Sequence, residues 1–125
     1  MSTDRGAPER TPKVDLKRIF SLDGVRMSLV IDPEGEVQEE MGAENIDGDQ
    51  LAAVVSFVMA ESRAMATRLG DDQISMVFVE FRVIALLSLP LEEGYFLLLL
   101  TDPSANVGQI SYELKKSQES AGALQ

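Results

Sequence analysis

The feature that most constrains this sequence is a helical repeat of apolar residues from Asp49 to Leu69 that has two separate faces. At about 100° per residue, the first face carries mainly large apolar side chains. It consists of Leu51, Val54, Val55, Val58, Met59, Met65, Ala66 and Leu69, with Ser62 among them. Such a face is typical of a helix that packs on the core of a domain.

The second face of this helix consists mainly of small residues. Ala53, Phe57, Ala60 and Ala64 recur at helical spacing and fall almost opposite the first face. A helix at the surface of a monomer needs only one apolar face, so the second face predicts another protein layer that approaches the helix closely. The alternative is that the alanines are helix formers on an exposed surface, and Phe57 argues against it.

The composition excludes several classes of function. The chain has 125 residues, the length of one domain, with 21 acidic and 11 basic side chains and a formal charge of −10. This charge repels nucleic-acid phosphates and anionic lipids, so we expect no nucleic-acid and no membrane partner. The chain has no Cys and no His, and therefore lacks a thiolate nucleophile and the commonest general base and metal ligand.

The two ends of the chain contribute little to the predicted domain. Residues 1–13 mix charged residues with Gly and Pro and have nothing to bury, which predicts a disordered arm. Residues 118–125 are expected to fray. The N-terminus has no apolar signal segment, and the longest apolar runs are too short to span a bilayer. We therefore expect a cytoplasmic protein with its domain at residues 14–117.

Periodicity and turn residues predict the order helix, two strands, long helix, three strands and helix. The first helix is expected at 14–22, the strands at 25–31, 36–40, 74–81, 83–89 and 95–101, and the last helix at 104–117. Asp32-Pro33-Glu34-Gly35 predicts a tight turn between the first two strands. Asp47 or Asp49 is expected to cap the long helix, and Gly70 to end it.

The composition of the strands indicates their places in the sheet. The last two strands are apolar on both faces, which predicts central positions with a layer above and below. The strand at 74–81 begins the meander and is largely apolar, so at an edge it would need a cover. The strand at 36–40 is an acidic edge, and eight acidic residues lie between Asp32 and Asp49 without a basic one. That run is interpreted as a solvated face, with an acidic docking surface as the alternative.

No pattern in the sequence carries enzyme chemistry. There is no Gly-rich phosphate loop, metal-ligand cluster or nucleophile with a positioned base. The carboxylate pairs Glu39/Glu40, Asp71/Asp72 and Glu92/Glu93 lie at predicted turns and strand ends, where solvated acids are common. The sequence therefore predicts a protein that is not an enzyme and has no cofactor or metal.

Several short motifs occur in an order found in a known family. They are Gly24-Val25 leading into Ser28-Leu29-Val30-Ile31-Asp32, then Gly35, Leu51-Ala52-Ala53, Leu69-Gly70 and Asn106-Val107-Gly108. With the order of elements, they make residues 14–117 resemble the roadblock/dynein light chain family. One departure is Phe81-Arg82, a tighter connection between the first two strands of the meander than the family leads us to expect.

The resemblance implies an α+β fold, a five-stranded antiparallel sheet with helices on both faces. It also implies a homodimer in which two sheets join into one and the two long helices lie side by side, which would cover the second apolar face. The expected dimer interface comprises Ala53, Phe57, Ala60, Ala64, Ile74, Met76 and Phe78.

The family consists of dimeric platforms, and its bacterial MglB-type branch binds small Ras-like GTPases and stimulates their hydrolysis. The resemblance thus implies a homodimeric module that binds and regulates a Ras-like GTPase. Expected contacts are Glu61, Arg63, Thr67 and Arg68, with Arg63 or Arg68 as a candidate arginine finger, although exposed helix arginines are more often solvated. The alternatives are a small-ligand sensor, whose candidate internal polar groups are Ser28, Ser62, Ser75 and Ser88, and a scaffold or dynein-light-chain-like subunit.

Overall fold

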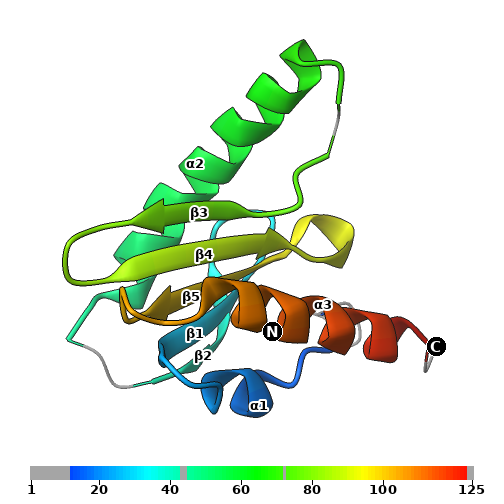
Figure 1. Ribbon diagram of the computed structural model, residues 1–125. Coiled ribbons are helices and arrows are strands. Elements are labelled where there is room, and N and C mark those ends of the chain that lie inside the picture. The colour runs from blue at the N-terminus through cyan, green and yellow to red at the C-terminus, as the bar shows by residue number, and fades with distance from the viewer. Residues whose placement is uncertain (1–11, 43–44, 72, 124–125) are drawn as a thin grey trace, which may run out of the picture.

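The computed structural model describes residues 12–42, 45–71 and 73–123, and the expected arm is therefore almost wholly outside the described residues. Its elements follow the predicted order (Figure 1). They are α1 (Leu16–Phe20), β1 (Val25–Ile31), β2 (Val37–Met41), α2 (Gly48–Arg68), β3 (Val77–Glu80), β4 (Ala85–Pro90), the 3-10 helix η2 (Glu92–Gly94), β5 (Phe96–Thr101) and α3 (Val107–Ala123).

The five strands form one antiparallel sheet in the order β2-β1-β5-β4-β3. The predicted α+β fold is confirmed, and so are the central positions of β4 and β5. β2 and β3 are the two edges. β2 is the acidic strand, whose exposed glutamates protect its edge by charge.

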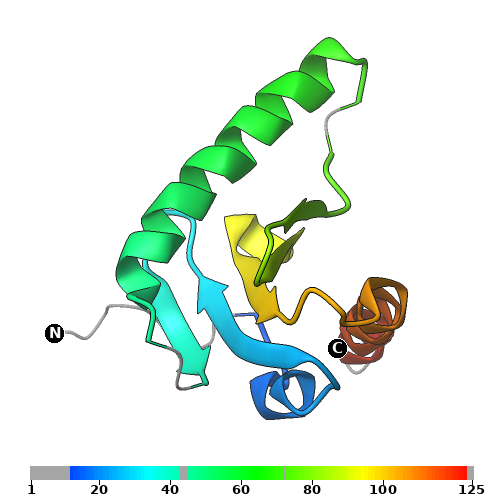
Figure 2. The same ribbon diagram turned by 60° about the vertical axis from the view of Figure 1, so that its left-hand side comes forward.

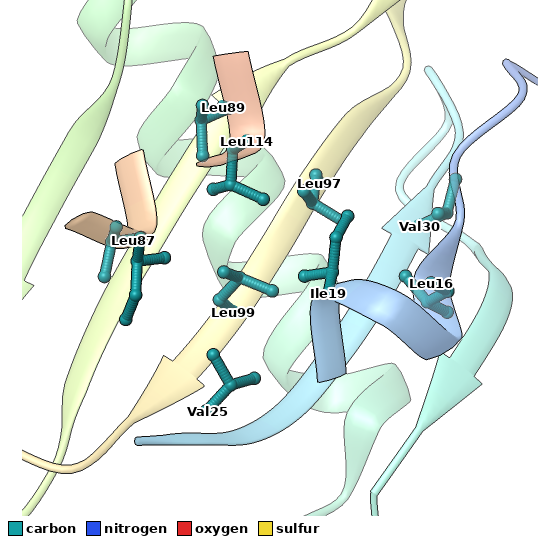
Figure 3. Packing of buried hydrophobic residues seen from close by; sticks show 10 residues of the cluster. Leu16, Ile19, Val25, Val30, Leu87, Leu89, Leu97, Leu99 and Leu114 are labelled. Carbon is teal, nitrogen blue, oxygen red and sulfur yellow. The ribbon is translucent and has the colours of Figure 1, made fainter. Parts of the chain in front are cut away.

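The sheet lies between two helical layers, with α2 on one face and α1 and α3 on the other (Figure 2). Alternation along each strand sends side chains into two separate cores. The α2-side cluster comprises Met27, Leu29, Ile31, Ala52, Val55, Met59, Leu86, Phe96, Leu98 and Leu100. The α1/α3-side cluster, drawn in Figure 3, comprises Leu16, Ile19, Val25, Val30, Leu87, Leu89, Leu97, Leu99, Ile110 and Leu114.

Local chemistry fixes both ends of α2. The Asp47 side chain accepts hydrogen bonds from the backbone N–H groups of Asp49 and Gln50, and so is the N-cap. Gly70 follows the helix with φ +88°, a conformation that costs glycine little. Its N–H donates to the Thr67 carbonyl. The predicted start and end of the long helix are thereby confirmed.

The meander and the last helix differ from the prediction in their bounds. β3 begins at Val77, and Phe81–Ile84 form a turn closed by a 2.8 Å hydrogen bond from Phe81 N–H to the Ile84 carbonyl. The expected connection at Phe81-Arg82 was too short, because apolar Val83 belongs to the turn and not to β4. The last helix begins at Val107 and continues to Ala123, past the expected end at 117, since the residues that follow are mostly compatible with a helix.

The first apolar face of α2 is only partly a core face. Val54, Met65 and Leu69 were expected in the core and are 61%, 60% and 78% exposed, whereas Ala52 is fully buried. Met65 and Leu69 are exposed because the sheet lies beneath only the first part of the helix. Val54 lies in that first part, but to one side of the buried residues Ala52, Val55 and Met59. The C-terminal half of α2 extends beyond β3 (Figures 1 and 2), so the apolar residues of this half do not pack on the sheet of their own protomer.

Candidate interaction surface

The open edge of β3 is the first part of the candidate site. β3 pairs with β4 on one side, with Val77 opposite Ser88 and Val79 opposite Leu86. The hydrogen bond from the Phe81 N–H to the Ile84 carbonyl shows that the backbone groups of Phe81 point toward β4. In an antiparallel pair, every second residue directs its N–H and C=O toward the partner strand, so Val79 and Val77 also direct theirs toward β4. Phe78 and Glu80 direct theirs toward the open edge.

The exposed apolar side chains of α2 and of the β3–β4 hairpin form the second part. On α2 they are Val54, Phe57, Met65 and Leu69, and on the hairpin they are Phe78, Phe81 and Val83. Single exposed apolar residues are ordinary, but a group of this kind beside an open strand edge is typical of a protein interface. Among the described residues, β3 thus has no neighbouring strand on its outer side, and α2 carries exposed apolar residues.

The structure places the predicted dimer residues in two settings. Ala53, Phe57, Ala60 and Ala64 are all exposed and lie on the side of α2 opposite its sheet-facing residues. Phe78 lies in β3, on the face that carries the α1/α3-side cluster, because it pairs with Leu87. Ile74 and Met76 precede the strand and are half-buried, and Met76 packs against the same cluster.

The predicted partner contacts Glu61, Arg63, Thr67 and Arg68 lie on α2, and all four are exposed. The Thr67 hydroxyl donates to the Arg63 carbonyl one turn earlier, at 3.1 Å. The sequence missed the exposure of Val54, Met65 and Leu69. Met65 and Leu69 have the spacing of core positions, and only the extent of the sheet beneath the helix distinguishes them. Val54 lies over the sheet, but beside the buried residues of α2 and not among them.

The four serines considered for a small-ligand site do not converge. Ser28 lies opposite Leu99 and thus faces the α1/α3-side cluster, where its buried Oγ has no hydrogen-bond partner. Ser88 faces α2 and donates to the Met59 sulfur at 3.2 Å. Ser62 is half-buried on α2, and Ser75 is exposed. The structure therefore separates the polar groups that a sensor pocket would bring together.

A small apolar pocket lies between α1, α3 and the sheet. Its lining residues are Lys13, Val14, Ile19, Leu89, Leu91, Leu97 and Leu114, and its volume is about 10 Å³. A cavity of this size holds about one water molecule. This pocket is therefore too small for a metabolite.

The described parts of the chain contain neither a metal-binding cluster nor a membrane-spanning helix. Among these residues, no group of three or more acidic side chains has a spacing that could hold a metal ion. None of the helices in the described ranges is long and apolar enough to cross a membrane.

Comparison with known proteins gives consistent results. The family model of the Roadblock/LC7 domain matches residues 13–101. MglB, a gliding protein of Thermus thermophilus, has a similar solved structure with a TM-score of 0.76 at 24% identity, over 85% of this chain and 82% of that chain. A Roadblock/LC7 domain from Streptomyces avermitilis gives a TM-score of 0.73 at 20% identity, over 85% and 89%.

One further structure is more similar in sequence. An MglB with tetrameric arrangement has a TM-score of 0.71 at 26% identity, and the match covers 93% of both chains. No curated protein sequence matches the chain.

Proposed function

This chain belongs to the Roadblock/LC7 domain family, and we propose that it is a homodimeric interaction module that binds and regulates a small Ras-like GTPase. The chain is similar to MglB structures, and its resemblance to the MglB-type branch of the family supports a Ras-like GTPase as the partner. In this proposal residues 14–117 form the functional domain, and the protein works in the cytoplasm. It acts through its surface, without an active site or a cofactor of its own.

The observation that carries the proposal is the open, apolar β3 edge beside the apolar, projecting half of α2. An exposed edge strand with little protective charge invites pairing with another strand. β3 has apolar residues at three of its four positions, and only Glu80 is charged. A second copy related by a two-fold axis would supply the same edge and the same helix, so that one isologous contact covers both.

The dimer surface in this proposal consists of the β3 edge, the segment that precedes it and the exposed apolar surface of α2. It includes the predicted residues Ala53, Phe57, Ala60, Ala64, Ile74, Met76 and Phe78, together with Val54, Met65 and Leu69. Apolar exposure of this kind favours association, because each large side chain moved out of water contributes about 1.5–3 kcal/mol.

The GTPase contacts proposed on α2 are Glu61, Arg63, Thr67 and Arg68. None of the four is buried, and their polar groups can pair with those of a partner at the rim of an interface. An arginine supplied in trans can stabilise the charge that develops during phosphoryl transfer. Either Arg63 or Arg68 could fill that role, in which case the nucleotide and the catalytic phosphate loop belong to the partner.

Two alternative functions make different predictions. The small volume of the α1/α3 pocket and the separated serines weigh against a small-ligand sensor. A scaffold or dynein-light-chain-like subunit would form the same dimer but would not distinguish the two nucleotide states of a GTPase.

Equilibrium binding to purified Ras-like GTPases from the same organism, loaded with GDP or with a non-hydrolysable GTP analogue, tests the proposal. We expect binding that depends on the nucleotide, and no nucleotide turnover by the module alone. A thermal-shift screen against metabolites is the parallel test of the sensor alternative. Binding to neither nucleotide form of any GTPase tested, with a clear metabolite shift, would reject the proposal.

A further inference from the structure

The helical layer of α1 and α3 carries a large share of the positive charge of this acidic chain. Residues 13–20 and 107–116 contain five of its 11 basic side chains but only two of its 21 acidic ones. The five basic residues, all exposed, are Lys13, Lys17, Arg18, Lys115 and Lys116. This layer is therefore basic on a protein with a formal charge of −10.

The two acidic side chains of this layer both have partners within it. The Glu113 Oε1 atom lies 3.4 Å from Nη2 of Arg18, and Oε2 accepts a 3.0 Å hydrogen bond from Gln109. Asp15 accepts a hydrogen bond from the backbone N–H of Arg18 and caps α1. The Arg18–Glu113 pair links α1 to α3 and its charges cancel, so four lysines remain against one carboxylate. The basic face is defined here as Lys13, Lys17, Lys115 and Lys116.

The small apolar pocket between α1, α3 and the sheet lies within this basic face. Lys13 is one of its seven lining residues, and the other six are apolar. Figure 3 shows Leu114 of α3 beside Leu89, and Ile19 of α1 beside Leu97. Because Lys13 is exposed, its aliphatic stem can line the pocket while its ammonium group stays in water. The pocket is therefore reached from solvent beside a positive charge.

The other lysines of the basic face follow the pocket residues along the chain. Lys115 and Lys116 come directly after the lining residue Leu114 in α3, and Lys17 lies in α1, four residues after Lys13. The pocket has room for about one water molecule, so it accepts only the end of one apolar side chain. An apolar anchor with charged groups around it is a combination that protein interfaces use for affinity and specificity.

These features favour a protein partner over a lipid or a nucleic acid. A bilayer surface is flat and does not reach into a pocket between two helices, and an anionic bilayer repels the net charge of the chain. Among the described residues that line the pocket, none is aromatic and able to stack on a base. A segment of a protein can supply both an apolar side chain and carboxylates.

We propose that the basic face is a docking site for a short acidic segment of another protein. One apolar side chain of the segment enters the pocket, and the carboxylates beside it pair with the lysines. The α1/α3 layer lies on the opposite face of the sheet from α2 (Figure 2), and none of its site residues belongs to the proposed dimer surface or GTPase contacts. The module then holds an acidic partner on one face of the sheet and the GTPase on the other.

Selection from a phage-displayed library of short random peptides on the immobilised full-length protein tests this docking site. We expect the enriched peptides to combine several acidic residues with one large aliphatic residue. A synthetic enriched peptide is then titrated into the wild type, Lys13→Glu and Lys116→Glu, with fluorescence anisotropy as the readout. Each charge reversal should weaken binding by about tenfold or more at low salt. Alanine in place of the aliphatic residue of the peptide should weaken it by a similar factor.

Arg82→Glu is the matched control, because it changes the net charge by the same amount at an exposed residue of the β3–β4 turn, outside the basic face. It should bind the peptide like the wild type, and circular dichroism checks the fold of every variant. Enriched peptides without acidic residues, or equal affinities for Lys13→Glu, Lys116→Glu and Arg82→Glu, would overturn the docking site. Lys13-dependent binding of phosphatidylglycerol vesicles without peptide enrichment would overturn it too, in favour of a membrane surface. The GTPase titration reports on α2, so these outcomes leave the proposed function standing.

Discussion

Replacing Phe78 with proline should weaken the dimer without unfolding the protomer. The backbone N–H of Phe78 points to the open edge of β3, because the ladder to β4 runs through Val77 and Val79. Proline removes that N–H. Hydrogen bonds between β3 and β4 are unaffected, so each protomer should keep its sheet.

The size of the effect follows from the symmetry of the proposed contact. Each dimer would lose two edge hydrogen bonds, one from each copy, and a backbone hydrogen bond contributes about 0.5–1.5 kcal/mol. The loss of about 1–3 kcal/mol corresponds to a rise in the dimer Kd of roughly 5- to 150-fold. Steric conflict of the proline ring with the facing strand adds to this loss.

Phe78→Ala is the matched control, because it removes the same aromatic ring and keeps the N–H. Sedimentation equilibrium of the wild type and both variants gives the three dissociation constants, and circular dichroism reports the protomer fold. The reasoning is refuted if both variants have the same Kd with intact folds. Loss of the fold in Phe78→Pro alone would instead show that the Phe78 N–H faces β4.

Three other results are expected. Gly42→Ala should lower the free energy of unfolding by more than Gly70→Ala in chemical denaturation. Both glycines have positive φ, but a Cβ at Gly42 would lie 2.6 Å from the Arg26 carbonyl oxygen, whereas a Cβ at Gly70 would have nothing within 4 Å. Equal losses of unfolding free energy in the two variants would contradict this. Removing residues 1–13 should leave the melting temperature and the dimer unchanged, because the arm has nothing apolar to pack, and a fall of several degrees would contradict it. Leu69→Ala should raise the dimer Kd up to about 10³-fold, from about 2 kcal/mol of lost burial in each copy, whereas Tyr112→Ala on α3 should not change it in the same sedimentation assay.

The order of elements could be predicted because each has a clear local signal. Alternation in β1, continuous apolar runs in β4 and β5, and the Asp47 cap of α2 all depend on neighbours in sequence, and the structure bears them out. The bounds of the β3–β4 turn were harder to predict from the sequence. Val83 is apolar and continues the pattern of β4, and only the pairing of Phe81 with Ile84 shows that it lies in the turn.

The candidate site was predictable only in part. The apolar composition of residues 74–81 indicated an edge that needs a cover, and β3 is that edge. The helix was harder, because periodicity gives the direction of a side chain but not how far the sheet beneath it extends. Met65 and Leu69 therefore have the pattern of core residues, although the sheet ends before it reaches them.

The central claim is that the dimer is the form that binds a Ras-like GTPase. Its most direct test is isothermal titration of a GTPase loaded with a GTP analogue into the wild type, Phe78→Ala and Phe78→Pro. The concentration is chosen so that sedimentation shows the wild type and Phe78→Ala to be dimers and Phe78→Pro to be a monomer. We expect binding by both dimeric proteins and a large loss of affinity for Phe78→Pro. Equal affinity of the monomeric variant, or no binding by the dimeric wild type, would contradict it.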